Sequence, residues 1–259
     1  MSRLDELFAQ CRKENRAALI GYLPVGFPTY DVSVAGMLAM LEGGVDALEV
    51  GVPYTDPGID GPVIQVAVDA ALRAGTRVSQ VFDAVRTVSA HAPAVVMGYW
   101  NPIEKLTPAV FAERLKEAGG SGAITPDLIP EEAGPWIEAA RTHGLDPVFL
   151  VAPSSTDARI AVVGRASRGF VYAASTMGVT GTRATVGNRA EELVARTRAQ
   201  TDLPVCVGLG VSDGNQAAEV AAYADGVIVG SAFVRALGDG GPDAVRVLAQ
   251  DLAAGVRRR

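Results

Sequence analysis

The chain repeats one pattern along its length: an apolar run, then a loop, then a segment whose apolar residues have helical spacing. The runs are rich in β-branched residues and recur roughly every 20 to 50 residues. Such an alternation of strands and helices is typical of a parallel sheet covered by helices. The eight runs begin at Ala18, Ala47, Ala94, Gly122, Pro147, Gly169, Pro204 and Gly226.

Helices are expected after these runs, and one more at residues 4–13 precedes the first run. Asp157 and Asn188 carry side chains preferred at helix N-caps, and Gly144 is typical of a helix C-cap. The other predicted helices cover residues 30–42, 63–73, 78–90, 108–118, 131–143, 157–166, 188–200 and 215–222.

A length of 259 residues with 49% hydrophobic residues suits either one α/β barrel or two smaller domains. No Ser-, Pro- and Gly-rich linker interrupts the eight units, and eight βα units in about 250 residues fit one barrel. We therefore predict an α/β fold in which residues 1–259 form a single (β/α)8 TIM barrel. The extra N-terminal helix would plug or flank the barrel bottom.

The sequence excludes several classes of protein. The N-terminus lacks the apolar core of a signal peptide, and no apolar run reaches the roughly 18 residues of a membrane helix. A net charge of −6 with scattered Lys and Arg argues against nucleic-acid binding. Cys11 and Cys206 lack metal-type spacing and read as free thiols of a reducing compartment. We expect a cytoplasmic protein without membrane or nucleic-acid partners.

The residue types available for chemistry are limited. A Schiff-base aldolase needs a lysine inside the barrel, but Lys13, Lys105 and Lys116 fall in helix or loop positions. Metal catalysis usually needs imidazole ligands, but His91 and His143 fall at helix C-terminal ends. We predict no metal site, which leaves acid–base chemistry by carboxylates, with tyrosine as a further candidate.

Carboxylates cluster at the end of the second run. Glu49 lies within an apolar run, from which it can point into the barrel mouth, where chemistry takes place in this fold. Apolar surroundings would raise its pKa toward neutral, so that it could donate and take back a proton. A buried ion pair with arginine is the alternative, but no strand run contains arginine. Asp56 and Asp60 follow in YTDPGIDGP, where each could instead be a turn residue that bonds the backbone.

The last two runs end in glycine-rich segments, at residues 208–214 and 226–233, that lead into helical sequence. In barrels such a pair often binds phosphate through backbone N–H groups, and Ser231 could add its hydroxyl; tight turns alone are the alternative. The segment 176–187 exceeds the roughly two to six residues of a usual βα loop, which suggests either a mobile lid or a loop without function.

The residues alone therefore predict a metal-free barrel enzyme that uses carboxylates on a phosphorylated substrate. Tyr22, Tyr99 and Tyr172 would supply aromatic walls.

Four stretches resemble the tryptophan synthase α subunit family: LEVGVPYTDPGIDGPVIQ from Leu48, FVYAASTMGVTGTR from Phe170, PVCVGLGVSD from Pro204 and GVIVGSAF from Gly226. The resemblance extends from Arg16 to the last helix. It implies a metal-free retro-aldol cleavage of indole-3-glycerol phosphate to indole and glyceraldehyde 3-phosphate.

The resemblance also implies roles for single residues. Glu49 would protonate indole C3 and take the proton of the glycerol hydroxyl, while Asp60 would accept a hydrogen bond from the indole N–H. Tyr172 matches an active-site tyrosine, and Tyr22 stands where an aromatic ring packs on the indole. The implied phosphate contacts are Gly181, Gly210, Gly230 and Ser231, with Thr180 in a lid that approaches Asp60 on closure.

By the same resemblance, Asp56 and Gly58 belong to a loop that faces a β subunit in an α2β2 assembly. The β subunit would hold pyridoxal phosphate and receive indole, and this chain would need no cofactor. Thr55 and Gly58 depart from the usual Ser and larger apolar residue, and a lost apolar contact removes roughly 1 to 2 kcal/mol of interface burial. A stand-alone indole-3-glycerol-phosphate lyase of secondary metabolism therefore stays open.

Two further alternatives have less support. A sugar-phosphate isomerase or epimerase would reuse the phosphate loops, but no strand ends in His or Lys. A non-catalytic regulatory subunit could lose Glu49 and Asp60, and both are present.

Overall fold

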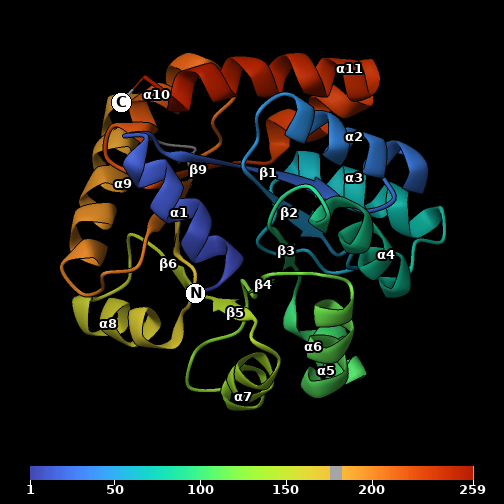
Figure 1. The fold of residues 1–259 in the computed structure, drawn as a ribbon, viewed down its shortest axis with the longest axis horizontal. Helices are drawn as coiled ribbons and strands as arrows, with labels where there is room; N and C mark the ends of the chain where they lie inside the picture. Colours follow the sequence, from blue (N-terminus) through green and yellow to red (C-terminus); the bar gives the residue numbers. More distant parts are fainter. Residues whose placement is uncertain (176–182, 259) are drawn as a thin grey trace.

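The computed structural model describes residues 1–175 and 183–258, and its strands form one parallel barrel surrounded by helices (Figure 1). The strand order is β5-β4-β3-β2-β1-β9-β8-β7-β6. The two strands at the ends of this order, β5 (Asp146–Val148) and β6 (Leu150–Val151), are separated in the chain only by Phe149. They are two parts of the fifth predicted run, so the sheet closes and the (β/α)8 prediction is confirmed.

The other strands lie within the predicted runs. They are β1 (Ala18–Pro24), β2 (Ala47–Gly51), β3 (Ala94–Met97), β4 (Gly122–Ile124), β7 (Val171–Ala174), β8 (Val205–Gly208) and β9 (Gly226–Val229). The helices are α1 (Arg3–Lys13), α2 (Tyr30–Glu42), α3 (Pro62–Arg73), α4 (Val78–Ser89), α5 (Trp100–Leu106), α6 (Pro108–Glu117), α7 (Gly134–His143), α8 (Asp157–Ala166), α9 (Arg183–Arg198), α10 (Gly214–Ala221) and α11 (Ser231–Val256).

The helix boundaries confirm one predicted cap and correct two. Gly144 ends α7 in the left-handed conformation, with φ 64°, as predicted. Asp157 is the first residue of α8 rather than its cap, because the Thr156 side chain accepts the Arg159 N–H. Asn188 is not a cap either, since α9 already begins at Arg183.

Three helical features lie outside the predicted ranges. α9 begins at Arg183, so residues 183–187 are helical although the segment 176–187 was expected to be a lid or loop. The short α5 follows β3 directly, where the sequence analysis expected only a loop. α11 is long and is interrupted at Gly241, whose φ of 67° and following Pro242 break the regular helix.

The first helix plugs the barrel bottom. Its buried residues Leu4, Phe8 and Cys11 pack in one cluster with inward-facing strand residues such as Ile20 and Val148. Figure 1 shows α1 lying across the ring of strands. A second, larger cluster fills the space between the strands and the outer helices. The chemistry must therefore use the opposite, open end of the barrel.

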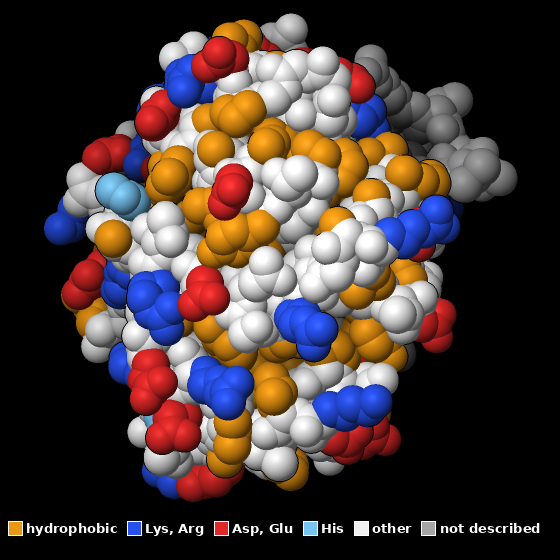
Figure 2. All heavy atoms as spheres, turned by 90° about the vertical axis from the view of Figure 1, so that its right-hand side faces the viewer, with side chains coloured by type: hydrophobic (Ala, Val, Ile, Leu, Met, Phe, Trp, Pro, Cys, Tyr) orange, Lys and Arg blue, Asp and Glu red, His pale blue; other side chains and the backbone are white. Residues whose placement is uncertain are grey.

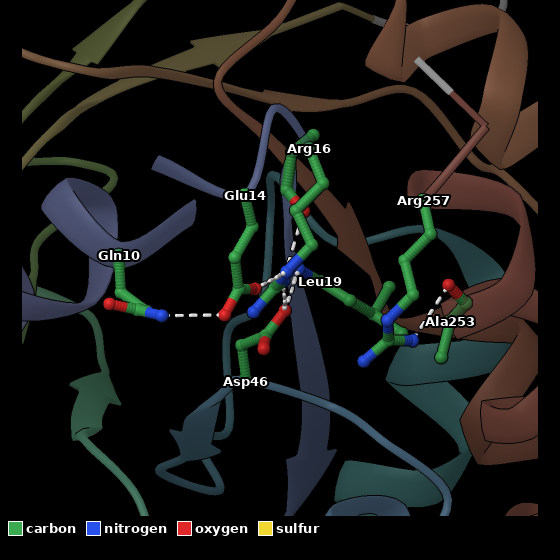
Figure 3. Close-up of polar contacts among 8 residues, drawn as sticks. Gln10, Glu14, Arg16, Leu19, Asp46, Ala253 and Arg257 are labelled. Carbon is green, nitrogen blue, oxygen red and sulfur yellow. Dashed lines mark hydrogen bonds and ion pairs between the residues drawn. The ribbon is translucent and has the colours of Figure 1, made fainter. Parts of the chain in front are cut away.

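An ion pair fixes the α1–β1 connection at this closed end (Figure 3). The Arg16 guanidinium lies 2.8 Å from the Asp46 carboxylate and 2.5 Å from that of Glu14. Asp46 also accepts the Leu19 N–H at 2.8 Å. The side chains of Arg16 and Asp46 are each only 11% exposed, so this pair is a buried link between the starts of β1 and β2.

The surface carries basic and acidic side chains interspersed with hydrophobic ones, as Figure 2 shows for the face formed by α2, α3 and α4. No helix in the described part of the chain is long and apolar enough to cross a membrane.

Candidate active site

A cavity of about 210 Å³ lies at the C-terminal ends of the strands. This is the end at which (β/α)8 barrels carry their chemistry. Of the nine residues that the sequence analysis assigned to catalysis or substrate binding, seven line the cavity: Tyr22, Glu49, Asp60, Tyr172, Gly210, Gly230 and Ser231. The other two, Thr180 and Gly181, lie outside the described residues.

Glu49 is a buried carboxyl group at the cavity floor. It lies on β2 between Tyr22 of β1 and Val95 of β3, and only 2% of the residue is exposed. Its Oε1 atom has no hydrogen-bond partner among the described residues, and no described arginine or lysine pairs with it. The expected alternative of a buried ion pair therefore has no support in this part of the chain.

The surroundings of Glu49 favour its neutral form. Burial, and then the nearby charge of Asp60, raise the pKa of Glu49 from 4.5 to about 8. Glu49 is consequently protonated at neutral pH and can donate a proton into the cavity.

Asp60 lies on the loop between β2 and α3 and is half-buried. Its Oδ2 accepts a hydrogen bond of 3.1 Å from the Tyr99 hydroxyl. Burial raises the pKa of Asp60, and the Tyr99 hydrogen bond opposes that rise. The side chain thus bonds a side chain that follows the neighbouring strand β3, which does not match the alternative of a simple turn residue that bonds its own backbone.

Two tyrosines lie flat against glycines on neighbouring strands. A Cβ atom on Gly51 would be 2.7 Å from the Tyr22 hydroxyl, and one on Gly208 would be 2.4 Å from the Tyr172 hydroxyl. Burial raises the pKa of both tyrosines well above the ordinary value, so both hydroxyls stay protonated. These two glycines are therefore required for the tyrosine positions.

The glycine-rich part of the cavity lining can hold an anion. Gly210 follows β8 with a φ of 71°, and Gly230 and Ser231 lead from β9 into α11. The first N–H groups of a helix are free to bond a ligand, and the helix dipole favours negative charge there. The positive φ of Gly210 also fits the tight-turn alternative, and one segment can serve both purposes.

Much of the cavity wall consists of residues that the sequence did not single out. Strand-end position and apolar character are the signals that could have identified these residues. They are Ile59, Gly61, Ile64, Met97, Pro126, Leu150 and Ala174. Gly208, Leu209 and Ile228 also line the cavity, but they belong to the glycine-rich segments expected to bind phosphate, and Ser175 lies at the end of a predicted strand, where chemistry was expected. Tyr99, in contrast, was expected in the wall and does not line the cavity, because its hydroxyl is directed at the loop that carries Asp60.

The two histidines, which are not expected to take part in the chemistry, lie at helix ends as predicted. His91 follows α4 and His143 ends α7. Within residues 1–175 and 183–258, no three His, Cys, Asp or Glu residues are grouped closely enough to hold a metal ion.

Asp56 and Gly58, which were expected to face a partner, lie on the exposed loop before Asp60, outside the cavity lining.

The comparison with known proteins agrees with this geometry. The family model described as tryptophan synthase alpha chain matches residues 8–257. The chain belongs to the tryptophan synthase alpha chain family. It therefore carries that family's lyase activity, the cleavage of indole-3-glycerol phosphate to indole and glyceraldehyde 3-phosphate in tryptophan biosynthesis.

Individual relatives support the same conclusion. The tryptophan synthase alpha chain of Mycolicibacterium paratuberculosis is 58% identical over 259 residues, which cover 100% of this chain and 96% of the relative. That of Acidothermus cellulolyticus is 57% identical over 262 residues, covering 100% and 98%.

Solved structures match over the same length. The aminoacrylate-bound form of M. tuberculosis tryptophan synthase superposes with a TM-score of 0.92 at 54% identity, covering 99% of this chain and 100% of that one. The alpha subunit from Legionella pneumophila superposes with a TM-score of 0.90 at 30% identity, covering 99% and 98%.

Proposed function

We propose that Glu49 and Asp60 divide the proton chemistry of this cleavage between them. Glu49, protonated, gives its proton to C3 of the indole ring, which leaves positive charge on the ring nitrogen. The Asp60 carboxylate accepts the hydrogen bond of that N–H and stabilises its charge. Glu49, now a carboxylate, takes the proton of the glycerol hydroxyl next to the ring as the C–C bond breaks. The bond electrons return to the ring, which releases indole and an aldehyde, glyceraldehyde 3-phosphate.

One observation carries the proposal: two carboxyl groups share a cavity but have different surroundings. Glu49 is buried without a hydrogen-bond donor at Oε1, whereas Asp60 receives the Tyr99 hydroxyl. Environments that separate the protonation of two such groups are typical of acid–base pairs.

The cavity also suits the rest of the substrate. We propose that the indole ring packs against Tyr22, with Tyr172 beside it, while Gly210, Gly230 and Ser231 bind the phosphate. Thr180 and Gly181 keep their predicted roles, in the lid near Asp60 and at the phosphate, as part of this proposal.

The chemistry requires only proton transfers, which the two carboxyl groups supply. We therefore propose that this chain uses no cofactor of its own and that pyridoxal phosphate belongs to a β partner. The solved relatives from M. tuberculosis are described as tryptophan synthase, one of them in an aminoacrylate-bound form. A β subunit in an α2β2 assembly would contact the exposed loop of Asp56 and Gly58, beside Ile59, which is 58% exposed.

A Cβ atom on Gly58 would meet nothing within 4 Å, so a larger residue could stand there without clashing within the described chain. The relatives named above are alpha chains of tryptophan synthase rather than independent lyases. This favours the partnered form over the stand-alone alternative.

We further propose that residues 1–259 act as one catalytic domain, because all described strands join one sheet. We also propose a cytoplasmic location, where the buried thiols of Cys11 and Cys206 would stay reduced.

Indole release from indole-3-glycerol phosphate tests the residue roles. Glu49→Gln and Asp60→Asn should each lower turnover by about 10² to 10⁴-fold, because each loses a proton-transfer or charge-stabilising group. Binding of a substrate analogue without the glycerol hydroxyls should survive. Glu113→Gln, the same change on the exposed face of α6, serves as the control. Near-normal turnover of Glu49→Gln would refute the assignment.

The partner proposal needs a separate experiment. Indole release is measured with the purified chain alone and then with a cognate β subunit. A large rise on addition supports the α2β2 proposal, whereas fast turnover alone without a rise indicates an independent lyase.

A further inference from the structure

Tyr99 lies directly behind Asp60, outside the cavity lining. It follows β3, caps α5 and is 7% exposed. Its hydroxyl accepts the Ile59 N–H at 3.1 Å and donates to the Asp60 carboxylate, also at 3.1 Å. One hydroxyl therefore contacts two consecutive residues of the loop between β2 and α3, one through the backbone and one through the side chain.

The Tyr99 ring is itself held in place by the other end of this loop. It stacks on Tyr54 with ring centroids 5.1 Å apart and an interplanar angle of 28°. The Tyr54 hydroxyl accepts a hydrogen bond of 2.9 Å from Asn101. The segment from Tyr54 to Asp60 is thus fixed at both ends by residues that follow β3, while Asp56 between them stays exposed.

From this arrangement we propose that Tyr99 is a positioning residue for the lyase reaction, which holds the Asp60 carboxylate in place to receive the indole N–H. The inference rests on the proposed role of Asp60 and extends it to a residue that does not touch the substrate.

The charges around Asp60 explain why one hydroxyl matters. The titratable groups that face it are Glu49 from β2, Tyr22 from β1, Tyr172 from β7 and Tyr99 itself. None of these groups is a cation. Among the described residues, Tyr99 is the one hydrogen-bond donor to the Asp60 side chain. A hydrogen bond to the ionised form lowers a carboxyl pKa, so the Tyr99 hydroxyl favours the carboxylate that the reaction uses.

Tyr99→Phe tests this role because it keeps the ring and its stacking and removes only the hydroxyl. The acidic limb of the kcat/KM profile should move up by roughly one pH unit, and neutral-pH kcat should fall by about tenfold with a smaller change in KM. Tyr223→Phe is the matched control, because the Tyr223 hydroxyl is buried, has no described partner and lies away from the cavity. Exchange of the Ile59 amide hydrogen should also accelerate in Tyr99→Phe and not in the control.

A double variant separates the two proposals. If Tyr99 acts through Asp60, Tyr99→Phe should add little to the loss already caused by Asp60→Asn. The Tyr99 inference would be overturned if the acidic limb of Tyr99→Phe does not shift, or if the two losses of turnover multiply fully in the double variant. In either case a severe loss of turnover in Asp60→Asn would still support the proposed mechanism. Near-normal turnover of Asp60→Asn would overturn both.

Discussion

The protein should become more stable when its central acid is made permanently neutral. In Glu49→Gln the side chain keeps its size and stays uncharged at every pH. The folded wild-type protein must also keep Glu49 neutral, since burial and the Asp60 charge raise its pKa from 4.5 to about 8. The unfolded wild-type chain, however, gains free energy by ionising Glu49 in water.

The sign and size of the difference in free energy of unfolding between the two proteins follow from the two pKa values of Glu49. Below pH 4.5 the group is neutral in both states and the two proteins should be equally stable. As pH rises, the unfolded wild type is increasingly favoured until the folded group ionises near pH 8. A pH of 7 lies about 2.5 units above the unfolded pKa of 4.5, and at about 1.4 kcal/mol per unit the free energy of unfolding of the variant should exceed that of the wild type by roughly 3 to 4 kcal/mol.

Urea unfolding between pH 4 and 9, followed by circular dichroism, measures the difference. The free energies of unfolding of the two proteins should diverge as pH rises and run parallel above about pH 8. Glu113→Gln, an exposed control on α6, should stay parallel to wild type throughout. If the stability advantage of Glu49→Gln is absent or independent of pH, the conclusion that Glu49 is buried in its neutral form is wrong.

Three further outcomes are expected. The wild-type kcat/KM should fall about tenfold per pH unit above pH 8, as Glu49 loses the proton it donates, and a profile flat to pH 9.5 would contradict this. Ser231→Ala should raise KM about tenfold with little change in kcat, because a phosphate contact is lost equally from ground and transition states; an unchanged KM would place the phosphate elsewhere. Arg16→Ala should lower the free energy of unfolding by about 3 kcal/mol, since it leaves the buried Asp46 carboxylate without its cation; an unchanged urea midpoint would make the pair energetically neutral.

The repeat pattern was sufficient for the barrel, because each strand buried on both faces leaves a continuous apolar run. The boundaries of α2 and α8 were predicted to the residue. The sequence pattern does not decide which of two adjacent residues caps a helix. Thr156 and Asp157 are both good caps, and only the backbone geometry decides that Thr156 is the one used. α5 is seven residues long, too short for its helical period to stand out.

For the site, the charged and glycine positions stood out in the sequence, and the apolar wall did not. Glu49 was conspicuous because a carboxylate in an apolar run is costly unless it has a purpose. Ile64 and Leu150 line the same cavity but look like ordinary core residues in the sequence. Gly51 accommodates the Tyr22 ring from the next strand, a contact that depends on strand register and was therefore not predictable.

The proposed mechanism depends most directly on the protonation state of Glu49 in the folded chain. Infrared difference spectra of wild type against Glu49→Gln, recorded over a pH series, observe the carboxylic-acid C=O band directly. The band should be present at pH 7 and disappear with a midpoint near pH 8. Absence of the band at pH 7, with carboxylate bands in its place, would mean that Glu49 is ionised and cannot be the proton donor to indole C3.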